Sequence, residues 1–264
     1  MIASRTNPKI KQVRALRQRK ERDATGLFIV EGITHVAAAI EAGAQVEYVC
    51  YAPDLLTSPF AHELITRESA HGRPCYPCTS DVFESISEKE NPVGIVAVVR
   101  QAHVPLDHLR PDTFGFGVAL VSPQDPGNIG SILRTIDTVG ASGLILLDGG
   151  ADVYHPGAVR ASMGTLFSKQ VVSATFDEFI GWVKQCAYHI VGTSARASDD
   201  YRTAHYQLPL ILLMGSEQKG LSAEQMSICD VVVRIPMLGQ VSSLNLSVAA
   251  GVMLYEVLAH CKAS

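Results

Sequence analysis

Hydrophobic positions in the first hundred residues alternate between helical and strand-like spacing. Ile10, Val13 and Leu16 recur at helical intervals among cations, and this spacing predicts one helix over residues 9–20. The β-branched runs GLFIVEG, VEYVCYA and VGIVAVVR predict strands, whereas ITHVAAAIEAG and FAHELITRESAHG predict helices. This alternation predicts a compact α/β domain that ends near Arg100.

A stretch rich in proline and charge separates this domain from a second series of elements. QAHVPLDHLRPDT has little apolar periodicity, so we place an N-terminal domain at residues 1–103, a linker at 104–113 and a C-terminal domain at 114–264. The apolar runs GFGVALVS, GLILLD and LPLILLMG predict a parallel sheet covered by helices on both faces. The last helix, within IPMLGQVSSLNLSVAAGVMLYEVL, is expected to begin near Ser242.

Composition fits a globular protein of this kind. The chain has 264 residues, of which 47% are hydrophobic, and its longest apolar runs are well short of the roughly 18 residues of a membrane span. No secretory leader is expected, and six scattered cysteines indicate a reducing compartment, so we expect a cytoplasmic protein. Cys75 and Cys78 form one CxxC without a second ligand pair, so no metal is expected.

Positive charge is concentrated at the N-terminus. Residues 1–23 hold eight basic and two acidic residues, a net charge of +6, although the whole chain has a net charge of −4. Such a basic arm is a candidate element for contacting the phosphates of a nucleic acid, because lysine and arginine release counterions from a polyanion. A solvated helix face is an equally good interpretation of the composition alone.

Several common catalytic motifs are excluded by single positions. GSEQKGLS lacks the ending of a phosphate loop, because Leu221 follows Gly220. GFG at residues 115–117 precedes its strand and therefore cannot form a dinucleotide-binding turn, and HELIT has Thr66 where a zinc protease requires histidine. There is no G-x-S-x-G elbow.

Three irregular segments each follow a predicted strand: SPQDPGNIGSILRT, MGSEQKGLS and IPMLGQVSSLN. Ligands bind at the carboxyl edge of open α/β sheets, so these loops are expected to converge on one pocket. Together they resemble the three signature motifs of the SpoU/TrmH family of RNA ribose 2'-O-methyltransferases, within the SPOUT superfamily, over residues 118–258. Residues 4–100 also resemble the ribosomal-protein-like RNA-binding domain that precedes the catalytic domain in many members.

The resemblance implies an α/β fold with a knotted (trefoil) parallel-sheet methyltransferase domain, an S-adenosylmethionine cofactor and a homodimer with the active site at the subunit interface. It implies that the methyl donor is contacted by Gly215, Ile235 and Leu244, with Thr193 and Met237 nearby. Plain core packing is the alternative for Ile235 and Leu244. The small and polar residues before the last helix are interpreted as a pocket wall, whereas a helix cap alone would account for Ser242 and Asn245.

Catalytic roles follow from the same resemblance. Asn128 and Arg134 correspond to positions near the reacting ribose, where Arg134 is the assigned activator of the 2'-hydroxyl. A guanidinium is a poor base, so stabilising the alkoxide or holding a phosphate is the alternative. Glu217 matches the acidic position of the second motif and is expected to orient main-chain groups or the ribose, with a carboxylate favoured at a helix start as the alternative. Ser243 and Asn245 are expected to position Arg134 or the substrate.

RNA is the expected partner. Arg160, in VRASMGTLF, fits the family pattern and is expected to contact RNA, with an interface or structural role as the alternative. Gln218 and Gln170 depart from the usual pattern at positions without an assigned chemical role. The candidate RNA-binding residues of the basic arm are Arg5, Lys9, Lys11, Arg14 and Arg17.

The resemblance thus predicts methylation of a ribose 2'-hydroxyl, and the N-terminal domain favours large-subunit ribosomal RNA over transfer RNA. A non-catalytic RNA-binding or ribosome-assembly protein is the competing hypothesis from another class. A third hypothesis keeps the donor and moves the target to a base nitrogen.

Overall fold

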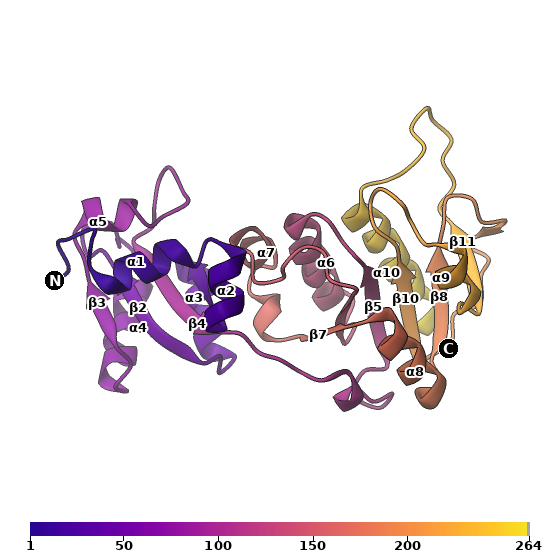
Figure 1. Ribbon diagram of the computed structural model, residues 1–264, viewed down its shortest axis with the longest axis horizontal. Coiled ribbons are helices and arrows are strands. Elements are labelled where there is room, and N and C mark those ends of the chain that lie inside the picture. Colours follow the sequence, from indigo (N-terminus) through magenta and orange to yellow (C-terminus); the bar gives the residue numbers. More distant parts are fainter. Residues whose placement is uncertain (263–264) are drawn as a thin grey trace. The chain divides into compact units, whose positions relative to one another are not determined.

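The computed structural model describes residues 1–262 and divides into two compact units (Figure 1). Unit 1 contains Met1–Ala102 together with Tyr154–Ser168. Unit 2 contains His103–Val153 and the described residues from Lys169 onward. The segment Tyr154–Ser168 lies within the C-terminal domain by sequence and nevertheless clusters with the N-terminal unit.

Unit 1 is built on a four-stranded sheet with the order β1-β4-β2-β3. Strand β4 is antiparallel to both of its neighbours, and β2 and β3 are parallel. The strands are β1 Leu27–Glu31, β2 Val46–Tyr51, β3 Cys75–Pro77 and β4 Ile95–Arg100. The helices are α1 Pro8–Ala15, α2 Arg19–Thr25, α3 Ile33–Glu41, α4 Pro59–Ala70, α5 Ser80–Glu84 and α7 Pro156–Ala161, with the 3-10 turn η2 Thr165–Phe167.

The single helix predicted over residues 9–20 is wrong, because the chain forms two helices there. Helix α1 ends at Ala15 and α2 begins at Arg19. The buried guanidinium of Arg22 donates from Nη1 to the carbonyls of Leu16 (2.9 Å) and Arg17 (2.7 Å). These bonds satisfy carbonyl groups just past the end of α1, so a contact from the next helix replaces continued helical pairing.

The segment Tyr154–Ser168 is held on unit 1 by aromatic packing and hydrogen bonds. The Phe28 ring lies 4.7 Å from the Tyr154 ring and 6.2 Å from the Phe167 ring, measured between centroids. The Tyr154 hydroxyl donates to the carbonyl of Ala102 at 2.6 Å. Helix α7 therefore packs on β1, although more than a hundred residues separate them in the chain.

Unit 2 contains a seven-stranded sheet in which all the paired strands are parallel, as the apolar runs predicted. Its order is β7-β6-β5-β10-β8-β11-β9, so the later strand β10 inserts between β5 and β8. The strands are β5 Phe116–Val121, β6 Gly143–Leu147, β7 Gln170–Ala174, β8 His189–Thr193, β9 Asp199–Asp200, β10 Leu210–Met214 and β11 Val231–Arg234. The helices are α6 Pro126–Thr138, α8 Phe176–Cys186, α9 Ala223–Ser227 and α10 Leu246–Lys262, with the 3-10 turn η1 Leu106–His108.

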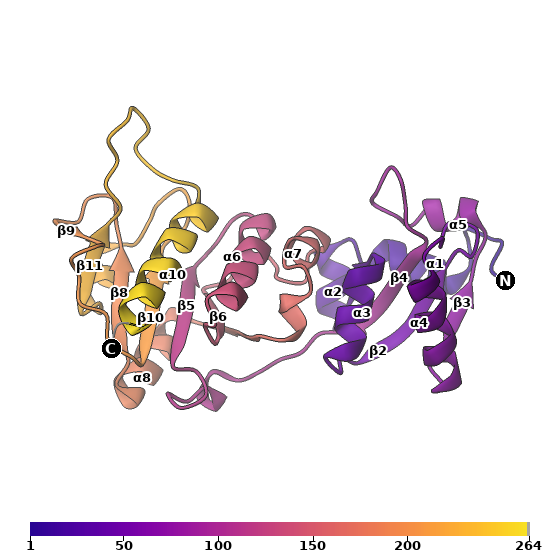
Figure 2. The same cartoon turned by 180° about the vertical axis from the view of Figure 1, so that it is seen from behind.

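Helices cover both faces of this sheet. Helix α8 begins with a capping box between Thr175 and Glu178, and its aromatic side chains pack on alternate residues of the central strands. Helices α6 and α10 lie side by side on the opposite face (Figure 2). Strands β5, β6 and β10 are almost entirely buried, as expected for strands covered on both sides.

Two boundaries in unit 2 differ from the sequence prediction. The stretch predicted as a linker contributes Leu109 to the core, where its carbonyl accepts a hydrogen bond from Trp182 Nε1 at 3.1 Å. Helix α10 begins at Leu246 and not near Ser242. No helix within residues 1–262 is long and apolar enough to cross a membrane.

Candidate active site

The carboxyl ends of three neighbouring strands bring the predicted donor-binding residues to one edge of the sheet. Thr193 is the last residue of β8, Gly215 follows β10 and Ile235 follows β11. Strand β8 pairs with both β10 and β11, and Thr193 is in register with Val233. The three residues therefore lie at the end of the sheet where parallel α/β folds bind ligands.

Gly215 occupies a place where only glycine fits. A Cβ atom at this position would lie 2.0 Å from the carbonyl carbon of Gly220 and 2.2 Å from its oxygen. The Gly220 N–H closes the turn by donating to the Ser216 carbonyl at 2.9 Å. The second motif thus forms a tight loop whose main chain doubles back on Gly215.

The loop between β11 and α10 presents unpaired main-chain groups. In the part of the chain that the structure describes, the N–H groups of residues 237–244 have no hydrogen-bond partner. Met237 is half-buried beside them, Leu244 is 37% exposed and Leu238 is 99% exposed. Free main-chain donors next to apolar side chains fit a nucleoside such as the adenosine of S-adenosylmethionine, which combines hydrogen-bonding edges with flat apolar faces.

Glu217 joins the second motif to the first. Its carboxylate accepts hydrogen bonds from the main-chain N–H groups of Gln124 (2.9 Å) and Asp125 (3.3 Å) and from Asn128 Nδ2 (2.9 Å). Asp125 in turn caps α6, because its Oδ1 accepts from the Gly127 N–H at 2.7 Å. The carboxylate therefore fixes the entrance of the helix that carries Asn128 and Arg134.

The charge state of Glu217 follows from these contacts. Burial by itself raises the pKa of this carboxyl. Hydrogen bonds from Asn128, from its own backbone and from the Gln124 and Asp125 amides outweigh burial, and the net pKa is lowered. Glu217 lies in a turn and not at the start of its own helix, so main-chain orientation describes its contacts better than the helix-start alternative.

Arg134 lies on α6 with its side chain exposed. It has no hydrogen bond or ion pair with any residue between 1 and 262. Ser243 is also exposed, in the loop before α10. The structure thus brings Asn128 to Glu217 but does not join Ser243 to Arg134 by a hydrogen bond within the described residues.

Asn245 is the cap of α10. Its Oδ1 accepts hydrogen bonds from the Ser247 N–H (2.8 Å) and from the Ser247 hydroxyl (2.7 Å). The cap that the sequence allowed for Ser242 or Asn245 is therefore made by Asn245. No hydrogen bond connects Asn245 with Arg134 in the described chain, and its role in positioning Arg134 or the substrate stays a prediction.

Most cations of the basic arm have protein partners. Arg5 pairs with Asp81, Lys9 lies over the Tyr48 ring at 4.3 Å, and Arg17 donates to the Ser87 carbonyl at 2.6 Å. Arg14 donates to the Ser85 hydroxyl at 3.2 Å, and the exposed Lys11 side chain has no partner among residues 1–262. Some candidate RNA-binding side chains are thus held by contacts within the protein, whereas Lys11 is exposed and could contact RNA.

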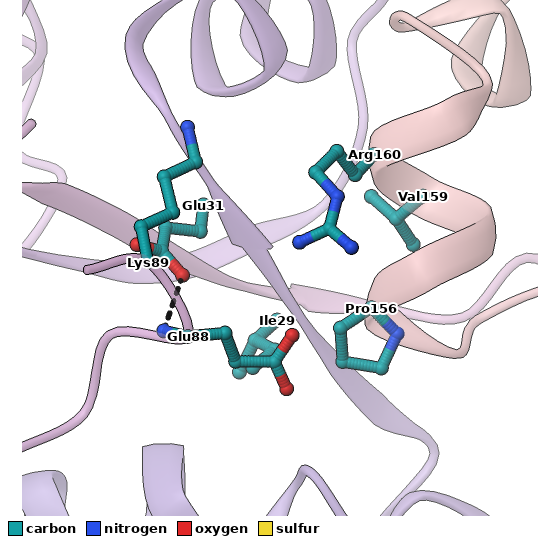
Figure 3. Close-up of a pocket in the computed structure, with 7 residues that line it drawn as sticks. All are labelled: Ile29, Glu31, Glu88, Lys89, Pro156, Val159 and Arg160. Atoms are coloured by element: carbon teal, nitrogen blue, oxygen red, sulfur yellow. Dashed lines mark hydrogen bonds between the residues drawn. The ribbon is translucent and has the colours of Figure 1, made fainter. Parts of the chain in front are cut away.

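Arg160 belongs to unit 1 and reaches from α7 towards β1 (Figure 3). It lines a pocket with Lys89, Glu31 and Glu88, where the Glu31 carboxylate accepts a hydrogen bond from the Glu88 N–H at 3.1 Å. The buried His35 contacts the Arg160 carbonyl through Nε2 at 3.2 Å. Burial lowers the pKa of His35, and the charges of Lys89 and Arg160 lower it further against the opposing effect of that hydrogen bond.

Two groups at the site were missed by sequence reasoning. The main-chain amides of Gln124 and Asp125 hold Glu217, although only their side chains are visible in a sequence. The available signal was the Asp125-Pro126 pair, which is a typical start of a helix. Among the described residues, no group of histidine, cysteine, aspartate and glutamate could hold a metal ion.

Family models match both parts of the chain. The model of the SpoU rRNA methylase family matches residues 115–255, and that of the MRM3-like substrate-binding domain matches residues 7–97. The chain is 36% identical to the 23S rRNA (uridine(2479)-2'-O)-methyltransferase of Streptomyces viridochromogenes, over 97% of this chain and 91% of that protein. It is 28% identical to the 23S rRNA (guanosine(2553)-2'-O)-methyltransferase RlmP of Bacillus subtilis, over 97% and 98% of the two chains.

Solved structures agree with these matches. The AdoMet-bound rRNA methyltransferase of Sinorhizobium meliloti superposes with a TM-score of 0.90 and 36% identity, covering 98% of this chain and 97% of that one. The SPOUT-type α/β fold with a smaller N-terminal domain is therefore confirmed. The loops of the three motifs follow β5, β10 and β11 at the carboxyl edge of one parallel sheet, and family models match both domains, so this chain belongs to the SpoU rRNA methylase family, as its motifs predicted.

Proposed function

We propose that this protein transfers a methyl group from S-adenosylmethionine to a ribose 2'-hydroxyl of large-subunit ribosomal RNA. The observation that carries the proposal is that the neighbouring parallel strands β8, β10 and β11 place Thr193, Gly215 and Ile235 at the same edge of the sheet. The Glu217 carboxylate ties this edge to the first motif. The names of the relatives, which modify 23S rRNA at ribose positions, support both the reaction and the substrate class.

The methyl donor is proposed to bind to residues at and after the carboxyl ends of β8, β10 and β11. When bound, S-adenosylmethionine supplies an electrophilic methyl group on its sulfonium. The unpaired N–H groups of residues 237–244 would hydrogen-bond the adenine and ribose, and Ile235, Met237 and Leu244 would cover the apolar faces. Gly215 keeps the second loop close enough to form the opposite wall.

Arg134 acts on the acceptor. Its guanidinium stays protonated and is a poor proton acceptor, so it stabilises the negative charge that develops on the ribose oxygen or holds an adjacent phosphate. The side chain is exposed and unpaired within residues 1–262, which leaves its donors available to RNA. Asn128 and Glu217 hold the helix that carries it.

RNA docking is assigned to unit 1. The exposed side chains of Lys11 and Arg14 lie on α1, and Arg160 is presented by α7 in the same unit. Exposed cations without a strong protein partner are suited to phosphate contacts. This arrangement supports recognition of structured RNA by unit 1, as its match to a substrate-binding domain suggests.

We further propose that the protein works as a homodimer. Helix α10 exposes Val248 (52%) and Tyr255 (55%) on the side that does not pack into the core, and the preceding loop exposes Val241. An apolar stripe of this kind fits a second copy of the chain. Sedimentation should give twice the chain mass, and Tyr255→Glu should give the monomer. A monomeric wild-type protein would exclude the dimer.

We also propose that the protein acts in the cytoplasm. All six cysteines are free, which fits a reducing compartment in which ribosomes are assembled. Fractionation of cells that express the protein from its own promoter tests this point, and recovery outside the cytoplasm would contradict it.

The deciding experiment for the reaction is transfer of labelled methyl groups to RNA. Total RNA from a strain that lacks the protein is incubated with the enzyme and the labelled donor, and ribosomal and transfer RNA are then separated. Label in 23S rRNA at a nucleotide that resists alkaline cleavage is the expected result. Label in transfer RNA, or on a base instead of a ribose, would show that the proposed substrate is wrong. Absence of methyl transfer despite donor binding would favour the non-catalytic hypothesis.

A further inference from the structure

A glycine pair after β6 lies against the first motif. The turn that follows β6 contains Gly149 and Gly150, both with positive φ (74° and 97°). The Ala151 N–H in this turn donates to the Pro123 carbonyl at 2.6 Å, and the Ser122 hydroxyl donates to the Asp148 carbonyl at 3.3 Å. The turn and the loop after β5 are therefore held together by one main-chain hydrogen bond and one hydrogen bond from a side chain.

The two glycines differ sharply in their surroundings. A Cβ atom at Gly150 would lie 2.3 Å from the Pro123 oxygen and 2.9 Å from the Pro123 nitrogen. A Cβ atom at Gly149 would meet nothing within 4 Å. Only Gly150 is thus required by close approach, since its neighbour is rigid backbone and not a flexible side chain.

Pro123 directly precedes the two amides that hold Glu217. The Gln124 N–H lies 2.9 Å from Glu217 Oε2, and the Asp125 N–H lies 3.3 Å from Oε1. A shift of Pro123 moves both donors, because they follow it in the same peptide chain. Asp125 also caps α6, so the same shift reaches the helix that carries Arg134.

We propose that Gly150 is a positioning residue for methyl transfer, which holds Pro123 so that the Gln124 and Asp125 amides stay aligned on Glu217. This inference rests on the proposed function for its kinetic consequence. Its structural consequence, which is the alignment of the two amides on the Glu217 carboxylate, does not depend on the reaction. The residue touches neither the substrate nor the donor in this scheme and acts only through the loop.

The test compares Gly150→Ala with the matched control Gly149→Ala. Both variants place a side chain at positive φ, and only the first meets Pro123. We expect Gly150→Ala to lower kcat about tenfold or more, while Gly149→Ala stays within about twofold of the wild type at equal thermal stability. Equal kcat values for the two variants would overturn the proposal.

A second measurement follows the Glu217 carboxyl directly by NMR titration. The amides of Gln124 and Asp125 help to lower its pKa, so misalignment in Gly150→Ala should move its titration to higher pH, and Gly149→Ala should leave it unchanged. An unchanged Glu217 titration in Gly150→Ala would overturn the proposal. If wild-type protein methylates no RNA but the titration shifts as expected, the proposed function fails and the positioning role stands.

A milder variant covers the case in which Gly150→Ala does not fold. Ser122→Ala removes the hydrogen bond to Asp148 without adding any atom to the contact. We expect Ser122→Ala to lower kcat about twofold to fivefold and to shift the Glu217 titration to higher pH, in the same direction as Gly150→Ala but by less. A wild-type Glu217 titration in Ser122→Ala, with Gly150→Ala unfolded, would count against the proposal.

Discussion

Asn128 Nδ2 donates to Glu217 Oε1 at 2.9 Å and so links the first and second motifs over 89 positions of sequence. The amide side chain is buried, and the carboxylate also accepts from two main-chain N–H groups. Three donors on one carboxylate form a network whose strength depends on the negative charge of Glu217.

Acid should weaken this network. The folded pKa of Glu217 lies below its ordinary value of 4.5, so the ionised carboxylate contributes stability that is present above that value and is lost as the pH falls through the folded pKa. We expect Glu217→Gln to lose about 1 kcal/mol of unfolding free energy at neutral pH and to show a smaller decrease on acidification.

Urea unfolding between pH 7 and pH 3.5 measures this difference. Glu63→Gln is the matched control, because Glu63 is exposed on α4 and has no hydrogen-bond partner within residues 1–262. Identical pH dependence of the wild type and Glu217→Gln would contradict the assignment.

Removing Arg134 should separate chemistry from binding. We expect Arg134→Ala to lower methyl transfer by about a hundredfold or more, because charge stabilisation in the transition state is lost, while the affinity for S-adenosylmethionine is retained. Its exposed side chain has no partner among residues 1–262, so the melting temperature should stay the same. Calorimetry measures the affinity for S-adenosylmethionine, and single-turnover kinetics measures methyl transfer. Lys184→Ala, at an exposed position on α8, is the surface control. Near-normal turnover would remove Arg134 from the mechanism.

Substitution of Gly215 should act on donor binding. A Cβ atom there lies 2.0 Å from the backbone of Gly220, so Gly215→Ala must open the second loop. We expect the affinity for S-adenosylmethionine to fall about tenfold or more. Gly181→Ala, on α8 with nothing within 4 Å of its Cβ, is the matched control and should bind normally. Equal donor affinities in the two variants would show that the loop does not shape the site.

Two cations of the basic arm should behave differently. Lys11 is exposed and unpaired among the described residues, so Lys11→Ala should weaken RNA binding and reduce the slope of log affinity against log salt by about one. Arg22 is 1% exposed and holds the end of α1, so Arg22→Met should cost about 2 kcal/mol of unfolding free energy and leave that slope unchanged. RNA titrations at several salt concentrations measure the effect on RNA binding, and urea unfolding measures the effect on stability. A changed salt slope in Arg22→Met would contradict the purely structural role of Arg22.

Local patterns predicted most of the elements, and the errors occur at helix ends, where side-chain hydrogen bonds to the main chain decide the boundary. The capping box of Thr175 and Glu178 spans four residues, so the start of α8 depends on local sequence alone. The break between α1 and α2 depends on the buried guanidinium of Arg22, which helical periodicity does not reveal. Helix α10 begins later than expected because Asn245, and not Ser242, supplies the cap.

The sequence by itself determined the alternation of strands and helices, the family and the placement of three polar loops after apolar strands, because these depend on local spacing and residue type. Tertiary structure decided which of those groups meet. Insertion of β10 between β5 and β8 sets which strand ends are neighbours, and folding brings Glu217 to the amides before α6 and lays Tyr154 on Phe28. Such contacts depend on strand order and close packing between distant segments, and neither is encoded in the spacing of neighbouring residues.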